Sequence, residues 1–427
     1  MSVTVTSSAH QIPSQFLTMG RIGRGSYGVV DRAIDRRTNK PVALKTSHGR
    51  DLFVDLEDAR RIATEMALLA SIRCPFIVRI VGAVRFRRGD RAVSFALEPA
   101  EMDLHRMLYE EPMLEPTLEA APDAAADEAL DEAAANGALA KVVADLRTDH
   151  RELDRLLCIF YQLLLALDHL HRRDIAHYDV TARNILIVRG GGVKLCDLGL
   201  AGPATRSTGR RVMLWNRAPE IHAAESTFAG ATPHYGAPAD VFAAGCVLVE
   251  LLQYWLRTGR DRRGEPPVAG ERRAPFADLE ESMGLAETLE IITRVIGRPS
   301  AEDMAALGVL PLRPWGRADD CAPRGALGDI LAGAPAGLVD VARSMLQLNP
   351  HKRPTCEQLL RCELFTGCPP VAQLVAQLSA APHSAAQLCA AALSLAPIIE
   401  CIASTATTQD TMEAMFEGIT LTLSNLC

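Results

Sequence analysis

HYDVTARNILI, residues 177–187, is the most informative segment of this sequence. It places the carboxylate of Asp179 five residues before the side-chain amide of Asn184, which is followed by an apolar run. Phosphoryl transfer needs a carboxylate that orients the attacking hydroxyl and accepts its proton, together with oxygen ligands for Mg²⁺. Asp179 and Asn184 can supply both. Further along, Asp197 in CDLGL (196–200) can bind the metal ion that bridges the β- and γ-phosphates, so these residues predict a phosphotransfer centre.

A glycine-rich segment, IGRGSYGVV, occupies residues 22–30 between two strand-like runs. Gly23, Gly25 and Gly28 have G-x-G-x-x-G spacing, and their missing side chains let backbone N–H groups approach phosphates. A glycine hairpin or a dinucleotide-binding fingerprint would look similar, but the fingerprint needs a helix next, and here another strand-like run follows.

A lysine then lies on an apolar strand-like run, VALK at 42–45. An unpaired ammonium would be costly to bury there, so Lys45 needs anionic partners. Phosphate oxygens are one, and the other is Glu65, which lies at the edge of an apolar helical face. A surface glutamate is the alternative for Glu65 alone, but the ordered spacing favours an ion pair with Lys45.

These motifs, taken in order, resemble the eukaryotic protein kinase superfamily from Leu17 to about Phe365. In that family a glycine loop, a strand lysine, a helix glutamate, H-R-D-x-x-x-x-N, D-F-G and A-P-E follow one another, and APE at 218–220 completes the order. The resemblance implies an α+β, bilobal protein kinase fold, with a small β-rich N-lobe that has one main helix and a larger α-helical C-lobe. It also implies ATP and Mg²⁺ as cofactors and proteins as substrates.

The resemblance implies a role for each matching residue. The implied catalytic residues are Asp179, Lys45 and Arg183, and the implied metal ligands are Asn184 and Asp197. The residues implied to contact ATP are Ile22, Gly23, Gly25, Gly28, Val30, Ala43, Lys45, Glu65, Leu97, Glu98 and Ala100. Among them, Leu97 would guard the back of the adenine pocket, while Glu98 and Ala100 would offer backbone hydrogen bonds.

The resemblance also implies contacts that do no chemistry: Glu220 pairs with Arg353, and Asp240 braces the catalytic loop. LWNRAPE at 214–220 and LEIITRVIGRPS at 289–300 resemble segments of the cyclin-dependent and mitogen-activated branch, which are features of Ser/Thr kinases. The H-x-D-x-T pattern that begins at residue 177 also resembles that of herpesvirus-encoded kinases.

The sequence departs from this branch where the branch senses phosphate. Three arginines that grip an activation-loop phosphate are replaced by Thr64, Tyr178 and Gly202. Thr208 stands where the branch carries its activating phosphothreonine, but a phosphate without arginines gains little from charge-assisted hydrogen bonds. We therefore expect activity that does not depend on phosphorylation of Thr208.

Other departures lie near the reacting centre. Thr181 replaces the lysine that steadies the γ-phosphate, and Met213 replaces a threonine that hydrogen-bonds the catalytic loop. Arg183 lies four residues after Asp179, as in the A-A-R-N of receptor tyrosine kinases, where an arginine takes over the task of the lysine. The main interpretation is an active Ser/Thr protein kinase. The alternatives are a pseudokinase scaffold that binds nucleotide or partners without turnover, and a kinase specific for tyrosine.

The expected parts of the chain are an N-terminal extension (1–16), a kinase domain (17–366) with an N-lobe (17–98), an acidic insertion (110–150) and a C-lobe (151–366), and a helical Ala- and Leu-rich tail (367–427). The insertion has no Lys or Arg between residues 110 and 140. Charge runs usually only solvate a segment, so we interpret it as a solvated insertion, with docking of basic partners as the alternative. The helices of the tail are expected to pack onto the large lobe or a partner.

Composition limits the other partners. A net charge of -7 argues against a general polyanion binder, so nucleic acid is not expected. The apolar stretch 385–403 is interrupted by Gln387, Pro397 and Glu400, so a packed helix is expected and no membrane. The 11 cysteines show no C-x-x-C spacing, and the first residues lack a signal-peptide pattern. We therefore expect an intracellular protein, cytoplasmic, nuclear or both, in the host cell if viral.

Overall fold

The computed structural model describes residues 15–24, 28–47, 55–83, 86, 92–110, 152–188, 191–204, 214–226, 235–258, 275–276, 278–280, 283–307, 325–380, 395–405 and 408–426. Several expected features lie outside these residues: most of the N-terminal extension, Gly25, nearly all of the acidic insertion, Thr208 and Met213. The chain divides into two compact units. The first comprises Met1–Arg73, Val78–Ala100 and Pro397–Cys427, and the second comprises Cys74–Ile77 and Glu101–Ala396.

The first unit is built on an antiparallel sheet of five strands in the order β1-β2-β3-β5-β4. The strands are β1 (Phe16–Arg24), β2 (Gly28–Asp35), β3 (Lys40–Ser47), β4 (Ile80–Ala83) and β5 (Ser94–Leu97). Alternating residues on one face of the sheet form its core, with Phe16, Val42 and Leu44 at most 5% exposed. Gly28 is required by this sheet, because a Cβ there would lie 2.3 Å from the carbonyl oxygen of Thr46 on β3.

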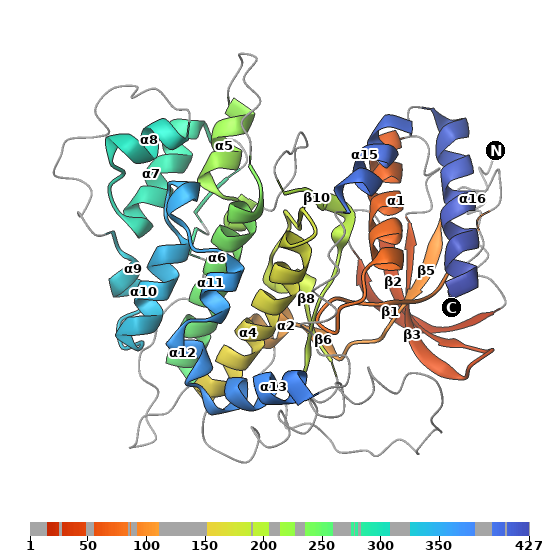
Figure 1. Ribbon diagram of the computed structural model, residues 1–427, viewed down its shortest axis with the longest axis horizontal. Helices are drawn as coiled ribbons and strands as arrows, with labels where there is room; N and C mark the ends of the chain where they lie inside the picture. The colour runs from red at the N-terminus through yellow and green to blue at the C-terminus, as the bar shows by residue number, and fades with distance from the viewer. Residues whose placement is uncertain are drawn as a thin grey trace, which may run out of the picture. The chain divides into compact units, whose positions relative to one another are not determined.

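The helix α1 (Leu56–Ser71) contains Glu65, which the sequence predicts to be helical, and it begins after Asp55, whose side chain caps Glu57 N. Buried residues continue around the helix and not along a single stripe, so α1 is covered on more than one side. One cover is β4, and the other is α16 (Gln409–Leu426), which lies alongside α1 (Figure 1). A shorter helix, α15 (Ala396–Thr405), precedes α16.

The second unit is mainly helical around α4 (Glu152–His171) and α6 (Ala237–Thr258), which pack against each other. The other α-helices among the described residues of this unit are α2 (Leu104–Tyr109), α5 (Pro219–Ser226), α7 (Leu285–Ile296), α8 (Ala301–Ala306), α9 (Leu327–Ile330), α10 (Ala336–Met345), α11 (Cys356–Leu360), α12 (Glu363–Thr366) and α13 (Pro369–Ala380). Among the described residues α6 alone is long and apolar enough to cross a membrane, but 89% of its apolar window is buried inside the protein, as in a core helix.

Short strands of the second unit carry the functional segments. One sheet has three strands, β6 (Met102–Asp103), β8 (Ile185–Ile187) and β9 (Val193–Leu195). A separate sheet pairs β7 (Ile175–Ala176) with β10 (Gly202–Pro203). The segments that precede β8 and follow β9 are those in which the sequence predicts the metal ligands.

The predicted fold class is confirmed, since one unit is built on a β-sheet with α1 and the other is mostly helical. The expectation of one main helix in the small unit is incomplete, because α16 also belongs to this unit and is as long as α1 or longer. The tail behaves differently from the expectation. Its first helix, α13, packs onto α4 of the large unit as expected, but α16 packs onto α1 of the small unit. The apolar pattern of the tail predicts that it is covered, but it carries no signal for which helix covers it.

Candidate active site

Lys45 and Glu65 form the predicted ion pair in the small unit. Lys45 lies on β3, between Val30 of β2 and Phe95 of β5, and its Nζ is 2.7 and 2.6 Å from the two carboxylate oxygens of Glu65 on α1. The side chains are 14% and 2% exposed, so both charges are largely out of water. Because breaking this pair would take the nearest opposite charge from a largely buried ion, the pair ties α1 to β3.

Residues implied to contact ATP lie on the strands beside this pair or directly after them. Ala43 on β3 is directly opposite Leu97 on β5, and the two are 8% and 7% exposed. Glu98 is anchored twice to Arg79: its amide donates to Arg79 O (3.0 Å), and its carboxylate accepts from Arg79 N (2.7 Å). Of its two backbone groups, Glu98 can therefore present only the carbonyl to a ligand.

The catalytic loop of the large unit is held from behind by Asp240, as predicted. One carboxylate oxygen accepts from His177 N and the other from Tyr178 N, both at 2.8 Å, and Asp240 itself is 1% exposed. His171 Nε2 lies 2.8 Å from the first of these oxygens. A carboxylate that accepts successive backbone N–H groups fixes the direction of the chain just before Asp179.

Asn184 contacts Asp179 directly. Its side-chain nitrogen donates to Asp179 O at 2.8 Å and to Asp179 Oδ2 at 2.7 Å. Since the amide nitrogen faces Asp179, the amide oxygen is the atom of Asn184 that can serve as a metal ligand. Asp179 and Asn184, five residues apart in sequence, are therefore joined by hydrogen bonds from one side chain.

His177 connects this loop to the segment that carries Asp197. Asp179 N donates to His177 Nδ1 (3.2 Å), so Nε2 carries the ring proton and donates to Cys196 O (3.0 Å). Cys196 N in turn donates to Asn184 O at 2.9 Å, across the start of the β8–β9 hairpin. Asp197 follows directly, in a left-handed conformation with φ 64°, which is uncommon outside glycine and is found at functional sites.

The donor set fits Mg²⁺. Within the described residues no group of three or more His, Cys, Asp or Glu side chains could hold a metal ion by itself. Mg²⁺, however, prefers hard oxygen ligands and is bound in phosphotransfer sites through one or two carboxylates together with substrate phosphates. The carboxylate of Asp197 and the amide oxygen of Asn184 are ligands of this kind.

Arg183 contacts a histidine of α2. It is exposed, and its Nη2 lies 3.1 Å from His105 Nε2 on α2. Burial, followed by the charge of Arg183, lowers the pKa of His105, so the imidazole is neutral and can accept from the guanidinium. The predicted action of Arg183 on the γ-phosphate is not tested by this contact and stays a prediction.

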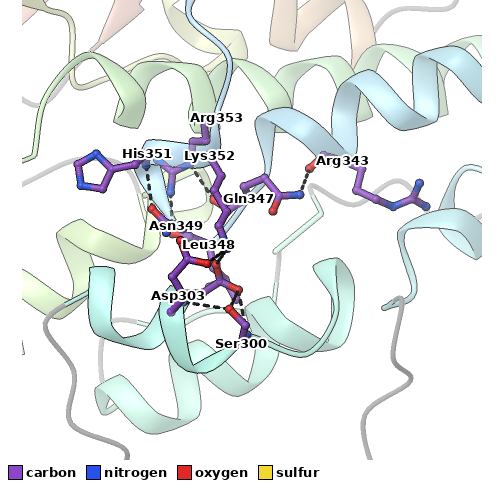
Figure 2. A network of polar contacts seen from close by, with 10 residues as sticks. Ser300, Asp303, Arg343, Gln347, Leu348, Asn349, His351, Lys352 and Arg353 are labelled. Carbon is purple, nitrogen blue, oxygen red and sulfur yellow. Dashed lines mark hydrogen bonds and ion pairs between the residues drawn. The ribbon is translucent and has the colours of Figure 1, made fainter.

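Glu220 and Arg353 form the predicted structural bridge. The two N–H···O contacts are 2.6 and 2.7 Å, and the side chains are 6% and 0% exposed. The remaining donors of Arg353 reach the carbonyls of Pro238, Gln347 and Leu348, the last two of which are labelled in Figure 2. All five N–H groups of the guanidinium are therefore satisfied in the interior, where an unpaired one would be costly.

Two features were not predicted from the sequence. The sequence marks Tyr178 only as a missing arginine, whereas the structure gives its hydroxyl specific partners. No sequence motif predicted that α16 packs on α1, the helix that carries Glu65.

The two-unit fold, the Lys45–Glu65 pair and the Asp179–Asn184 arrangement are those of a protein kinase. A family model for the protein kinase domain matches residues 16–365, and the chain belongs to this family. It is similar to mitogen-activated protein kinase 17 of Oryza sativa subsp. japonica, with 27% identity over 371 residues, which are 84% of this chain and 52% of that protein. Mitogen-activated protein kinase 20 of Arabidopsis thaliana is 27% identical over 363 residues (83% and 49%), and mitogen-activated protein kinase 15 of Rattus norvegicus is 28% identical over 365 residues (82% and 53%).

These relatives agree with the branch predicted from residues 214–220 and 289–300. They are plant and animal proteins and do not bear on the resemblance to herpesvirus kinases. The chain spans about half the length of each of the three.

Proposed function

We propose that this chain transfers the γ-phosphate of Mg·ATP to Ser and Thr hydroxyls of proteins, and that it does so without phosphorylation of its activation loop. The observation that carries the proposal is the arrangement of Asp179, Asn184 and the segment of Asp197, which are joined through hydrogen bonds of 2.7–3.2 Å. Phosphoryl transfer to a hydroxyl uses a carboxylate that orients the hydroxyl, together with a second carboxylate and an amide that hold the metal ions.

Each residue has a task in this reaction. Asp179 orients the substrate hydroxyl and accepts its proton, and its carboxylate is held in place by Asn184. Lys45, fixed by Glu65, presents its ammonium to phosphate oxygens. Bound Mg²⁺ would neutralise the charge on the phosphates, and Asp197 and Asn184 are the residues that would hold it.

The glycine loop supports the proposal of nucleotide binding. Among the described residues, the atom nearest to a Cβ built on Gly23 is Val30 Cβ at 3.8 Å, an ordinary contact, so the packing of these residues does not require glycine there. Close approach of phosphates to the backbone would require it. Ile22 is 51% exposed, an apolar side chain that adenine would cover.

The deciding experiment is Mg·ATP-dependent phosphorylation of a generic basic protein substrate by wild type and by Asp179→Asn. Asp340→Asn is a matched control, because Asp340 has a 73% exposed side chain on α10. We expect activity in wild type and in the control, and its loss in Asp179→Asn. Equal background in all three would favour the pseudokinase interpretation, and phosphoamino-acid analysis of the product separates Ser and Thr from Tyr.

The independence from loop phosphorylation is tested separately with Thr208→Ala. We expect this variant to keep activity within about tenfold of wild type, or about 1.4 kcal/mol of barrier. A larger loss would reject the independence while leaving the kinase assignment intact.

A further inference from the structure

Tyr178, the residue directly before Asp179, makes contacts that reach well beyond the catalytic loop. Its side chain is buried, with 4% of the residue exposed. Its hydroxyl donates to Pro203 O at 2.6 Å and lies 3.1 Å from Tyr235 O, so its single proton is shared unequally between two carbonyls. The ring meets that of Tyr235 edge to face, with centroids 5.4 Å apart and an interplanar angle of 83°.

The backbone of Tyr178 is equally constrained. It is left-handed, with φ 61°, and its amide donates to Asp240. A left-handed conformation outside glycine carries strain and persists only where the surroundings determine it. Tyr178 is therefore fixed at its backbone by α6 and at its side chain by Pro203 and Tyr235.

Gly202 leaves room for the ring of Tyr178 because it has no side chain. Gly202 lies on β10, opposite Ala176 of β7, and a Cβ built on it would lie 3.0 Å from Tyr178 Cε2. Tyr178 and Gly202 occupy two of the three positions at which the resembled branch carries its phosphate-gripping arginines. In this chain the first of these positions carries the Tyr178 ring, and the second, Gly202, leaves the space that the ring fills.

We propose that Tyr178 is a positioning residue that ties the catalytic loop to Pro203, at the start of the activation segment, and to Tyr235, in place of a phosphate held by arginines. This inference rests on the proposed function, because it explains how Asp179 is kept in place without a phosphorylated loop. The hydrogen bond joins a neutral phenol to backbone carbonyls, so it forms without phosphorylation of the activation loop.

The electrostatic surroundings agree with a donating phenol. Burial, followed by the charge of Asp240, raises the pKa of Tyr178, so the hydroxyl keeps its proton at physiological pH. Within the described residues the charged group facing it is Asp240, and Tyr235 is the titratable neighbour on the other side.

The test is Tyr178→Phe, which keeps the ring and removes only the hydroxyl. Tyr161→Phe is the matched control, because Tyr161 is also buried and its hydroxyl donates to a carbonyl, Leu360 O at 3.4 Å, on α11. We expect kcat to fall about tenfold in Tyr178→Phe, with KM for ATP unchanged, and neither constant to change in Tyr161→Phe. An unchanged kcat in Tyr178→Phe would overturn the proposal, whatever happens to thermal stability.

A double-mutant cycle with Gly202→Ala tests the fit between the two residues. The added methyl should push the ring from Pro203 and lower kcat on its own. If both changes act through the one hydrogen bond, Gly202→Ala has little further effect in the Tyr178→Phe background. Multiplicative effects would show that the two residues act separately and would refute the shared contact.

Hydrogen exchange separates failure of this inference from failure of the proposed function. Ala204 N donates to Asp174 O at 2.7 Å, next to Pro203, so its exchange reports whether this segment is held. Exchange at Ala204 should be faster in Tyr178→Phe than in wild type. That comparison decides the tether even if wild type shows no phosphotransfer, and equal exchange would reject it.

Discussion

The cover that α16 places over α1 can be tested with Phe416→Ala. Buried positions of α16 recur at helical spacing, with Met412, Phe416 and Leu423 all 0% exposed and Thr420 1% exposed. The Phe416 ring packs on Phe86, with centroids 5.4 Å apart. Truncating a fully buried phenylalanine removes its transfer free energy and leaves a cavity, so we expect the free energy of unfolding to fall by about 4 kcal/mol.

The measurement is urea unfolding together with hydrogen exchange of the α1 amides. Leu421→Ala is the control on the same helix, because Leu421 is 57% exposed and its loss should change the free energy of unfolding by less than about 0.5 kcal/mol. Faster exchange in α1 with Phe416→Ala, but not with the control, would locate the loss at the α1–α16 contact. A loss below about 1 kcal/mol would show that α16 is not a structural part of the small unit, because fully buried aromatic side chains cost more than this.

Two further changes have outcomes that follow from buried charges in the large unit. Arg353→Leu leaves Glu220 buried without its partner, so we expect a loss of about 3–5 kcal/mol in thermal unfolding, whereas Arg361→Leu, at an exposed ion pair with a 77% exposed arginine, should change it little. Burial raises the pKa of Glu250 to about 7, although the hydrogen bond that Tyr109 donates to it lowers the pKa in part. The folded state therefore keeps a proton that the unfolded state loses near the ordinary glutamate pKa of 4.5, and stability falls as pH rises from about 4.5 to 7. Glu250→Gln should match wild type near pH 4.5 and exceed it by up to about 3 kcal/mol above pH 7, as measured by urea unfolding across pH; an identical pH profile for both proteins would contradict the assignment.

Charged residues made much of the site predictable from sequence. Lys45, Glu220 and Asp240 each occur in an apolar context, and a buried charge has to find an opposite charge or backbone N–H groups. The apolar strand of Lys45 and the order of the motifs predicted Glu65 as its partner, whereas the partners of Glu220 and Asp240 were implied by the family resemblance. The structure places all of them at 2.6–2.8 Å.

Neutral contacts could not be predicted in the same way. The partners of the Tyr178 hydroxyl lie 25 and 57 residues away, and a buried phenol can be satisfied by any carbonyl within reach. Gly28 shows the converse, because the sequence suggested a glycine needed by phosphates while the structure shows that β3 already requires it. The sequence of the tail predicts helices with an apolar face, but it does not show which element covers that face. The pairing of α16 with α1 could therefore be found only in the folded structure.

The replacement for the arginine directly before Asp179 differs from it in one physical property. An arginine cluster stabilises a loop only when a phosphate supplies the opposite charge, which makes the contact conditional on a modification and weaker at high salt. The hydrogen bond from the hydroxyl of Tyr178 to Pro203 O involves no net charge. It supports the residue before Asp179 and does not depend on a phosphate on the activation loop. Salt should therefore have little effect on the activity that this contact supports, whereas a phosphate-dependent arrangement would lose activity as ionic strength rises.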